Sequence, residues 1–135
     1  MIIELIPFNR VGLFVFKENI EAYSAFDFSF TECDDITSWD VYELEEVGID
    51  IYTEKNCIVS IACRKELFFN GTNLIGLSFS TFTSKFNLKP SGETNRIYMP
   101  VDDDYQEVVE FDEIGIQIWL KENKILTVFC SDKVD

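Results

Sequence analysis

The side chains of this sequence that could do chemistry are mainly carboxylates, and they occur in groups. Asp102-Asp103-Asp104 is the densest group, and Asp34-Asp35 is another. Grouped carboxylates can bind a cation, act in hydrolysis or face the basic side chains of a partner. The first group lacks the alternating spacing and the glycine of a calcium loop, and no pocket signal accompanies it as a hydrolase site. A solvated loop and a partner-binding surface remain the two main interpretations.

Histidine is absent from the chain. This absence removes the commonest general base, the Ser–His and Cys–His nucleophile pairs and the commonest metal ligand. The cysteines show no C-x-x-C spacing, so we expect reduced thiols, with Cys63 and Cys130 as small buried side chains. The sequence therefore predicts a protein that is not an enzyme and has no cofactor or metal. The four cysteines are Cys33, Cys57, Cys63 and Cys130.

The composition is strongly acidic, with a net charge of −14 and a pI near 4.2. Such a charge disfavours direct binding to nucleic acid or to an anionic membrane and favours a basic protein partner. The alternative is that acidity only keeps an aromatic-rich chain soluble. The segment Met1–Pro7 has no basic region before its apolar residues, and no apolar run approaches the length of a membrane span. We expect a cytoplasmic protein.

Aromatic side chains stand close to the acidic groups. Trp39 follows Asp34-Asp35, and Tyr105 follows Asp102-Asp103-Asp104. Aromatic residues beside charges are typical of interface anchors, although on strands they are as often part of a core. The predicted partner-binding residues are Asp34, Asp35, Trp39, Asp102, Asp103, Asp104, Tyr105 and Glu107.

A segment that occurs twice in the sequence predicts the strands that must position these residues. Val41–Arg64, shifted by 67 positions, falls on Val108–Ser131 without a gap. Nine positions are identical, and others are conservative, such as Tyr52 with Trp119, for which we expect a shared structural role. We interpret the pattern as a tandem duplication. The identical pairs are Val41/Val108, Glu43/Glu110, Glu46/Glu113, Gly48/Gly115, Ile49/Ile116, Ile51/Ile118, Asn56/Asn123, Ile58/Ile125 and Cys63/Cys130.

Alternation of apolar and polar residues predicts three antiparallel strands in each segment, separated by turns at Gly48 and Gly115 and at the two asparagines. The predicted strands are Tyr42–Leu44, Ile49–Tyr52 and Ile58–Cys63, then Glu107–Phe111, Gly115–Leu120 and Ile125–Cys130.

The remaining segments predict short strands and one helix in each half. Helical spacing of Phe16, Ile20 and Tyr23 predicts a helix over Lys17–Ala25, and Ser78 can cap a helix whose apolar face is Phe79, Phe82 and Phe86. The other predicted strands are Ile2–Ile6, Ala25–Thr31 and Arg96–Met99.

These elements predict an α+β fold in a single domain, residues 1–135, built from two halves of about 1–65 and 66–135. Each half would supply a strand, a helix and three antiparallel strands. Together they would form an antiparallel sheet with short helices on one face, which leaves the other face of the sheet as the natural binding surface.

The chain resembles the immunity proteins of bacterial contact-dependent growth inhibition and related polymorphic toxin systems. The residues that carry the resemblance are the paired cores VGIDIYTEKNCIVSI and IGIQIWLKENKILTV, within Tyr42–Cys63 and Val109–Cys130, and NLIGLSFSTF at Asn73–Phe82. The tandem layout is also similar to that of beta-lactamase inhibitor proteins. Both resemblances imply inhibition by binding, and the first implies a cognate toxin C-terminal domain, commonly a basic nuclease, as the partner.

Two other classes of function stay open. A small-ligand-binding domain would have a cleft between the halves, lined by phenylalanines and a few polar groups. An adaptor protein would have many weak partners. The sequence leaves the oligomeric state open, since strands at the sheet edges could also pair two copies of the chain.

Overall fold

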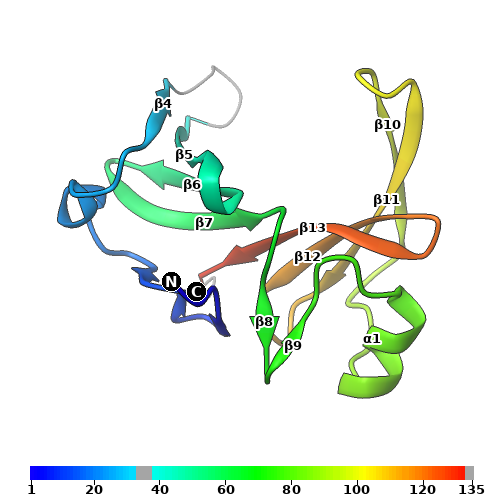
Figure 1. Cartoon of the computed structure of the whole chain (residues 1–135). Helices are drawn as coiled ribbons and strands as arrows, with labels where there is room; N and C mark the ends of the chain where they lie inside the picture. Colours follow the sequence, from blue (N-terminus) through cyan, green and yellow to red (C-terminus); the bar gives the residue numbers. More distant parts are fainter. Residues whose placement is uncertain (33–37, 133–135) are drawn as a thin grey trace.

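The protein is built around one antiparallel sheet of eight strands. The computed structural model describes residues 1–32 and 38–132. The strands of the sheet are β4 (Ser29–Thr31), β5 (Asp40–Leu44), β6 (Ile49–Glu54), β7 (Cys57–Cys63), β10 (Asn95–Met99), β11 (Asp104–Phe111), β12 (Ile116–Lys121) and β13 (Lys124–Ser131). Their order is β10-β11-β12-β13-β7-β6-β5-β4, so each half of the chain contributes four consecutive strands (Figure 1).

The two halves of the sheet meet at β7 and β13, and the pairing there is symmetric. Ala62 lies opposite Phe129, and these residues are themselves 67 positions apart. On either side of them, Ile61 pairs with Cys130 and Cys63 pairs with Val128. If each residue is replaced by its equivalent in the other half, the same residue pairs face each other across β7 and β13.

Local irregularities also recur at equivalent positions. The register between β6 and β7 shifts at Tyr52/Thr53, and that between β12 and β13 shifts at Trp119/Leu120. Each shift is a β-bulge, which increases the local twist of the pair. Gly48 and Gly115 both adopt the left-handed conformation, with φ of 68° and 66°. The sequence segments that match therefore fold into matching three-stranded units.

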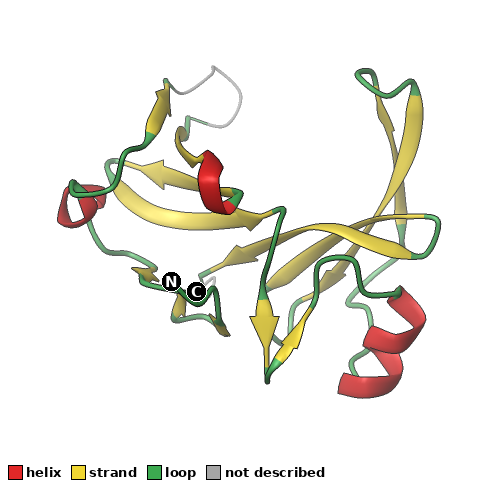
Figure 2. Cartoon of the chain, viewed as in Figure 1, coloured by secondary structure: helices red, strands yellow, loops and turns green. Residues whose placement is uncertain are grey.

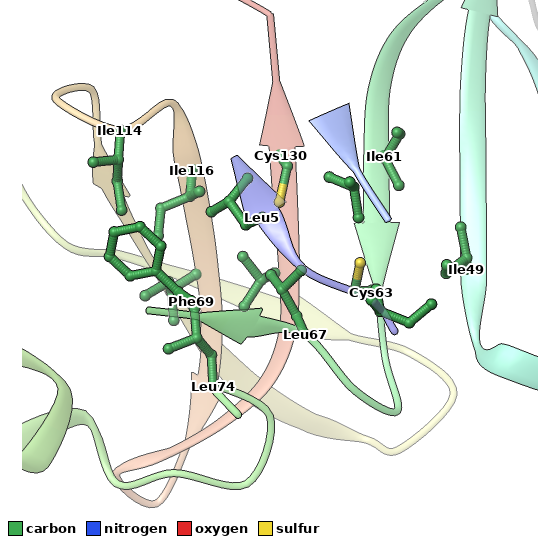
Figure 3. Close-up of a cluster of buried hydrophobic side chains, with 14 of the residues drawn as sticks. Leu5, Ile49, Ile61, Cys63, Leu67, Phe69, Leu74, Ile114, Ile116 and Cys130 are labelled. Atoms are coloured by element: carbon green, nitrogen blue, oxygen red, sulfur yellow. The ribbon is translucent and has the colours of Figure 1, made fainter. Parts of the chain in front are cut away.

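Short elements cover one face of the sheet. They are β1 (Leu5–Ile6), β2 (Arg10–Val11), β3 (Phe14–Val15), the 3-10 helix η1 (Ile20–Tyr23), β8 (Phe68–Phe69), β9 (Thr72–Asn73) and the α-helix α1 (Phe79–Phe86) (Figure 2). A further 3-10 turn, η2 (Glu45–Val47), connects β5 and β6. Ile20 and Phe82 join one buried cluster with the isoleucines of the sheet. This cluster spans both halves, with Ile61 of the first half and Ile116 of the second among its members (Figure 3).

Helix α1 agrees with its prediction. The Ser78 side chain accepts a hydrogen bond from the Thr81 backbone N–H at 3.1 Å, which satisfies a free donor of the first turn. Phe82 is completely buried and contacts Phe111 of β11 with ring centroids 5.2 Å apart. Burial of this aromatic face holds a helix whose Ser and Thr residues are poor helix formers.

The helix predicted over Lys17–Ala25 is wrong, because only Ile20–Tyr23 is helical. Lys17 has φ of 74°, and its N–H donates to the Ile58 carbonyl at 2.8 Å. The N–H of Ile58 in turn donates to the carbonyl of Glu18 at 3.0 Å. These bonds attach the segment to β7 as a turn, so the helix can begin only after Asn19.

Two strands predicted in the first half also need correction. Ile2–Ile6 shortens to β1, which pairs with β2 in a small separate sheet, and Ala25–Thr31 shortens to β4. The predicted α+β class with a mainly antiparallel sheet is confirmed. The predicted layout of each half is not, because the first strands stay outside the main sheet and an edge strand, β4 or β10, joins it instead. No helix in residues 1–32 or 38–132 is long and apolar enough to cross a membrane.

Candidate functional site

Most of the predicted binding residues lie on a two-stranded ribbon formed by β10 and β11. β11 pairs with β12 only from Glu107 onward, so Asp104, Tyr105 and Gln106 pair with β10 alone. The ribbon therefore extends past the end of β12, as Figure 1 shows. Asp102 and Asp103 lie in the turn at its tip.

Aromatic side chains pack along this ribbon. Tyr98 and Tyr105 lie opposite each other with ring centroids 5.3 Å apart, and both are 45% exposed. The guanidinium of Arg96 lies 4.3 Å from the centre of the Tyr105 ring. The Tyr98 hydroxyl donates to Asp103 Oδ1 at 2.5 Å, which raises the pKa of Tyr98. The ribbon thus presents ordered aromatic rings to solvent beside its acidic tip.

One carboxylate of the ribbon has an internal cation. Lys121 Nζ lies 2.8 Å from Asp104 Oδ2. The hydrogen bond from Lys121 is the main reason that the pKa of Asp104 is lowered, and the Tyr105 backbone N–H adds to it. Asp104 therefore serves in part to fix the ribbon against β12. The tip of the ribbon is open to solvent, since Val101, next to Asp102 and Asp103, is 96% exposed.

The other predicted residues do not share this location. Trp39 lies just before β5, on the far side of β12, β13, β7 and β6 from the ribbon. At about 4.8 Å between neighbouring strands, the five spacings from β11 to β5 amount to roughly 24 Å. Asp34 and Asp35 lie outside the described residues. The structure therefore brings Asp102, Asp103, Asp104, Tyr105 and Glu107 together and leaves Trp39 apart from them.

Trp39 belongs to a row of aromatic rings on the face of the sheet opposite the buried cluster. Its ring centroid lies 6.2 Å from Tyr52 of β6, which lies 6.0 Å from Phe129 of β13. Phe129 in turn lies 5.9 Å from Trp119 of β12. All four rings are half-buried and cross the junction of the two halves. We call this side of the sheet the open face.

The open face contains a pocket of about 760 Å³, within the range of ligand sites. The residues that line it are Phe8, Trp39, Ser60, Glu110, Asp112, Gly115, Ile116, Gln117, Trp119, Phe129, Ser131 and Asp132. Half of them come from β11, β12 and β13. Sequence reasoning left open a cleft between the halves but named only Trp39 among these residues as a binding residue, because Phe129 and Gln117 acquire their position only when the sheet is assembled.

Hydrogen bonds fix the polar wall of the pocket. The Gln117 amide donates from Nε2 to Glu110 Oε1 at 3.0 Å, and its oxygen accepts a bond from Trp119 Nε1 at 2.7 Å. The pairing of Tyr52 with Trp119 in the sequence was a signal for this face, although we expected only a structural role for it. The wall combines an oriented indole with carboxylates.

At the equivalent place in the first half, an arginine is surrounded by carboxylates. Arg64 donates to both oxygens of Asp50, with distances of 3.2 and 2.9 Å, and lies 3.5 Å from Glu45 Oε1. Repulsion from Asp50 raises the pKa of Glu43, and the positive charge of Arg64 partly opposes that effect. Tyr52, beside this group, has a raised pKa mainly because of its burial.

Three cysteine thiols lie in the described strands of the sheet, and two of them are buried. Cys63 and Cys130 are free and completely buried, as predicted, and Cys57 is free and half-buried. The hydrogen bond with Cys63, together with burial, holds the pKa of Cys130 well above its ordinary value. Cys33 lies outside the described residues. Within residues 1–32 and 38–132, no group of three or more His, Cys, Asp or Glu side chains could hold a metal ion.

Comparisons with known proteins give no assignment for this chain. Neither protein-family models, nor curated proteins, nor solved structures include a match.

Proposed function

We propose that this chain is an immunity protein, which binds and neutralises the basic toxin domain of a contact-dependent growth inhibition or related system. The observation that carries the proposal is the β10–β11 ribbon, where acidic and aromatic side chains gather on an extension of the sheet. Its shape suits insertion into the positively charged active-site cleft of a nuclease. The protein would act in the cytoplasm by excluding the substrate of the toxin.

Charge and aromatic surface would have different parts in such a complex. The carboxylates of Asp102, Asp103 and Glu107, together with the net charge of −14, would attract a basic partner and raise the association rate. Tyr98 and Tyr105 would lose their water at the interface and set the lifetime of the complex. The pairing of their rings in the free protein lowers the entropy cost of ordering them on binding.

A binding role rather than catalysis is supported by the side chains available. The sequence has no histidine, and the thiol of Cys130 is held in its protonated form by burial and by Cys63. The exposed carboxylates of the ribbon tip lie on a turn, where no surrounding residues shield a reacting group from water.

The first test is a pull-down with the tagged protein from its source cells at low and high salt. One stoichiometric basic partner that survives moderate salt supports the proposal, and its nuclease activity should fall when the protein is added. The absence of any partner at both salt concentrations overturns the proposal.

A pair of variants with equal charge change then tests the site. In D102K/D103K, the association rate should fall at least tenfold, and its dependence on salt should weaken. The matched control is D27K/E54K, which reverses two exposed carboxylates in the other half of the chain. Equal effects of the two pairs would show that only net charge matters, which contradicts a role for the ribbon.

We also infer that the chain arose by tandem duplication of a unit of about 65 residues. Support comes from the identities between Val41–Arg64 and Val108–Ser131, from the symmetric register around Ala62 and Phe129, and from the equivalent β-bulges. The halves have since diverged. One example is Arg64 of the first half, whose equivalent in the second half is Ser131.

A small-ligand-binding domain is a second candidate, and the pocket of about 760 Å³ favours it. A thermal shift with a panel of metabolites, in the absence of any protein partner, would support that function. A protein that gains stability from a metabolite and captures no basic partner would belong to this class instead.

A further inference from the structure

The first half of the chain contains a completed site for a guanidinium group. Arg64 follows β7 and reaches across the open face to the carboxylate of Asp50, which accepts two hydrogen bonds from it. Arg64 Nη2, which donates one of these bonds, also lies 3.5 Å from Glu45 Oε1, and the charge of Glu43 acts on Arg64 as well. The ring of Tyr52 completes the surroundings, close enough for the charge of Arg64 to affect its pKa.

The second half reproduces these surroundings without the arginine. Equivalence follows from the register, since Glu43, Asp50 and Ala62 form one cross-strand row and Glu110, Gln117 and Phe129 form the other. The position that corresponds to Arg64 is Ser131. Both residues donate their backbone N–H at 2.9 Å to the carbonyl of the equivalent glycine, Gly48 or Gly115. The residues corresponding to Glu43, Glu45, Asp50 and Tyr52 are Glu110, Asp112, Gln117 and Trp119.

The pocket of the open face lies where the arginine side chain is missing. Glu110, Asp112, Trp119 and Ser131 all line it. Across the described part of the chain, neither Glu110 nor Asp112 has a Lys or Arg nitrogen within 4.0 Å, whereas Arg64 has two carboxylates within that distance. Among the described residues, Glu110 and Asp112 therefore line the cavity beside the indole of Trp119 with no Lys or Arg paired to either of them, whereas a third carboxylate of the pocket, Asp132, lies 3.5 Å from Lys17 Nζ.

We propose that this pocket binds the guanidinium group of an arginine side chain from a basic protein partner. The source of the arginine rests on the proposed function, but the chemistry of the pocket does not. Glu110 and Asp112 would supply the charge, and the rings of Trp119 and Phe129 would cover the planar group and the stem of the side chain. The binding would reproduce, between two chains, the contacts that Arg64 makes within one.

The geometry favours arginine over lysine. Gln117 uses its oxygen to orient Trp119 and its amide to orient Glu110, so both walls are held in place before a ligand enters. A guanidinium is planar, so it can donate two parallel hydrogen bonds to a carboxylate and stack on an indole. The ammonium group of lysine is a compact point charge, which lacks this paired geometry and the flat surface for stacking. The replacement of Asp50 by Gln117 lowers the negative charge, so Glu110 and Asp112 must pair directly with the ligand.

The chain contains two tryptophans, Trp39 and Trp119, and both line this pocket. Tryptophan fluorescence and the two indole N–H resonances in an NMR spectrum therefore report directly on it. The probe is N-acetyl-arginine methylamide, with the lysine and citrulline analogues as matched controls. We expect the arginine probe to shift the Trp119 resonance with saturation, the lysine probe to bind more weakly and the neutral citrulline probe to have no effect.

Three variants test the assignment. E110Q/D112N should weaken the arginine probe at least tenfold, because charged hydrogen-bond partners are lost. S131R places an arginine where the first half has Arg64, and it should block the pocket while both carboxylates remain. The matched control, E43Q/E45Q, changes the equivalent carboxylates of the first half and should leave the affinity of the probe unchanged.

The outcomes separate this inference from the proposed function. If the probe leaves both indole resonances unchanged, or binds E110Q/D112N as well as the parent, the pocket does not recognise guanidinium, whether or not a toxin partner is found. If the probe binds as expected but no basic partner is captured from cells, the pocket chemistry stands and the immunity proposal fails. Unchanged probe binding in a folded S131R protein would place the site elsewhere.

Discussion

Ala62 of β7 lies directly opposite Phe129 of β13, at the junction of the two halves of the sheet. The small side chain of Ala62 leaves space for the Phe129 ring, which extends over it to within 6.0 Å of the Tyr52 ring on β6. One aromatic side chain therefore connects the open faces of both halves. The two positions are equivalent in the repeat, yet they carry side chains of very different size, Ala62 in the first half and Phe129 in the second.

Truncation of Phe129 should cost much less stability than truncation of a core ring. Phe82 is completely buried, so F82A should lower the free energy of unfolding by about 3–5 kcal/mol. Phe129 is half-exposed and loses mainly its ring contacts, so F129A should cost about 1–2 kcal/mol. Urea unfolding measures both values. An F129A cost equal to that of F82A would show that the open face is covered in solution.

The equivalent glycines should respond unequally to alanine. Both have positive φ, which costs an alanine about 1–2 kcal/mol. A Cβ at Gly48 would lie 2.6 Å from Cγ of the flexible Lys65 side chain, which can move. A Cβ at Gly115 would lie 2.6 Å from the Phe8 ring and 3.0 Å from the Ser131 carbonyl oxygen, which belongs to the backbone. G115A should therefore be more destabilising than G48A.

Thermal unfolding of the two glycine variants tests this order. Asparagine variants at the same positions provide the control, because asparagine tolerates the left-handed conformation better than alanine does. G48N should recover part of the loss of G48A. G115N should not recover, since its side chain meets the same backbone oxygen. Equal losses in G48A and G115A would contradict the close contact between Phe8 and Gly115.

The segments that the sequence predicted correctly are those whose structure depends on local signals. Gly48, Gly115 and the Phe79–Phe86 helix with its Ser78 cap all have a short-range cause, either positive φ or a side-chain cap. The Lys17–Ala25 helix failed because the helical spacing of its apolar residues was outweighed by backbone bonds to β7, a strand about 40 residues away. Local patterns cannot report such bonds.

The candidate site could be predicted only in part for a similar reason. The ribbon residues Asp102–Glu107 are contiguous in sequence, so they were found together. The open-face pocket combines Trp39, Glu110 and Phe129, whose proximity depends on the order of the strands. The alignment of Arg64 with Ser131 was visible in the sequence, but its meaning required the contacts of Arg64.

Removal of the helix cap should destabilise the protein by a small and specific amount. S78A removes the acceptor for the Thr81 N–H and should cost about 0.5–2 kcal/mol. The control is S84A, an exposed position inside the same helix, where alanine has a higher helix propensity and stability should rise slightly or stay the same. Chemical denaturation of both variants gives the comparison. A loss in S84A as large as that in S78A would contradict the capping role.

The ion pair between Asp104 and Lys121 should make the ribbon sensitive to acid. Because Lys121 lowers the pKa of Asp104 in the folded protein, the pair stabilises the fold above the ordinary pKa of an aspartate. That contribution is lost as the pH falls through the lowered pKa. The stability difference between the parent and D104N should therefore be largest near neutral pH and should disappear in acid. Salt should reduce this difference, because Asp104 is exposed and Lys121 is only partly buried.

Carbon-detected NMR of the Asp104 carboxyl group measures the lowered pKa directly. K121M should move that pKa back toward the ordinary value, because its main cause, the hydrogen bond from Lys121, is removed. The same variant should broaden the Tyr98 and Tyr105 ring signals, since the outer part of the ribbon then loses its ion pair to β12. If the Asp104 pKa is the same in K121M and the parent, the pair does not form in solution and the ribbon is held by its strand pairing alone.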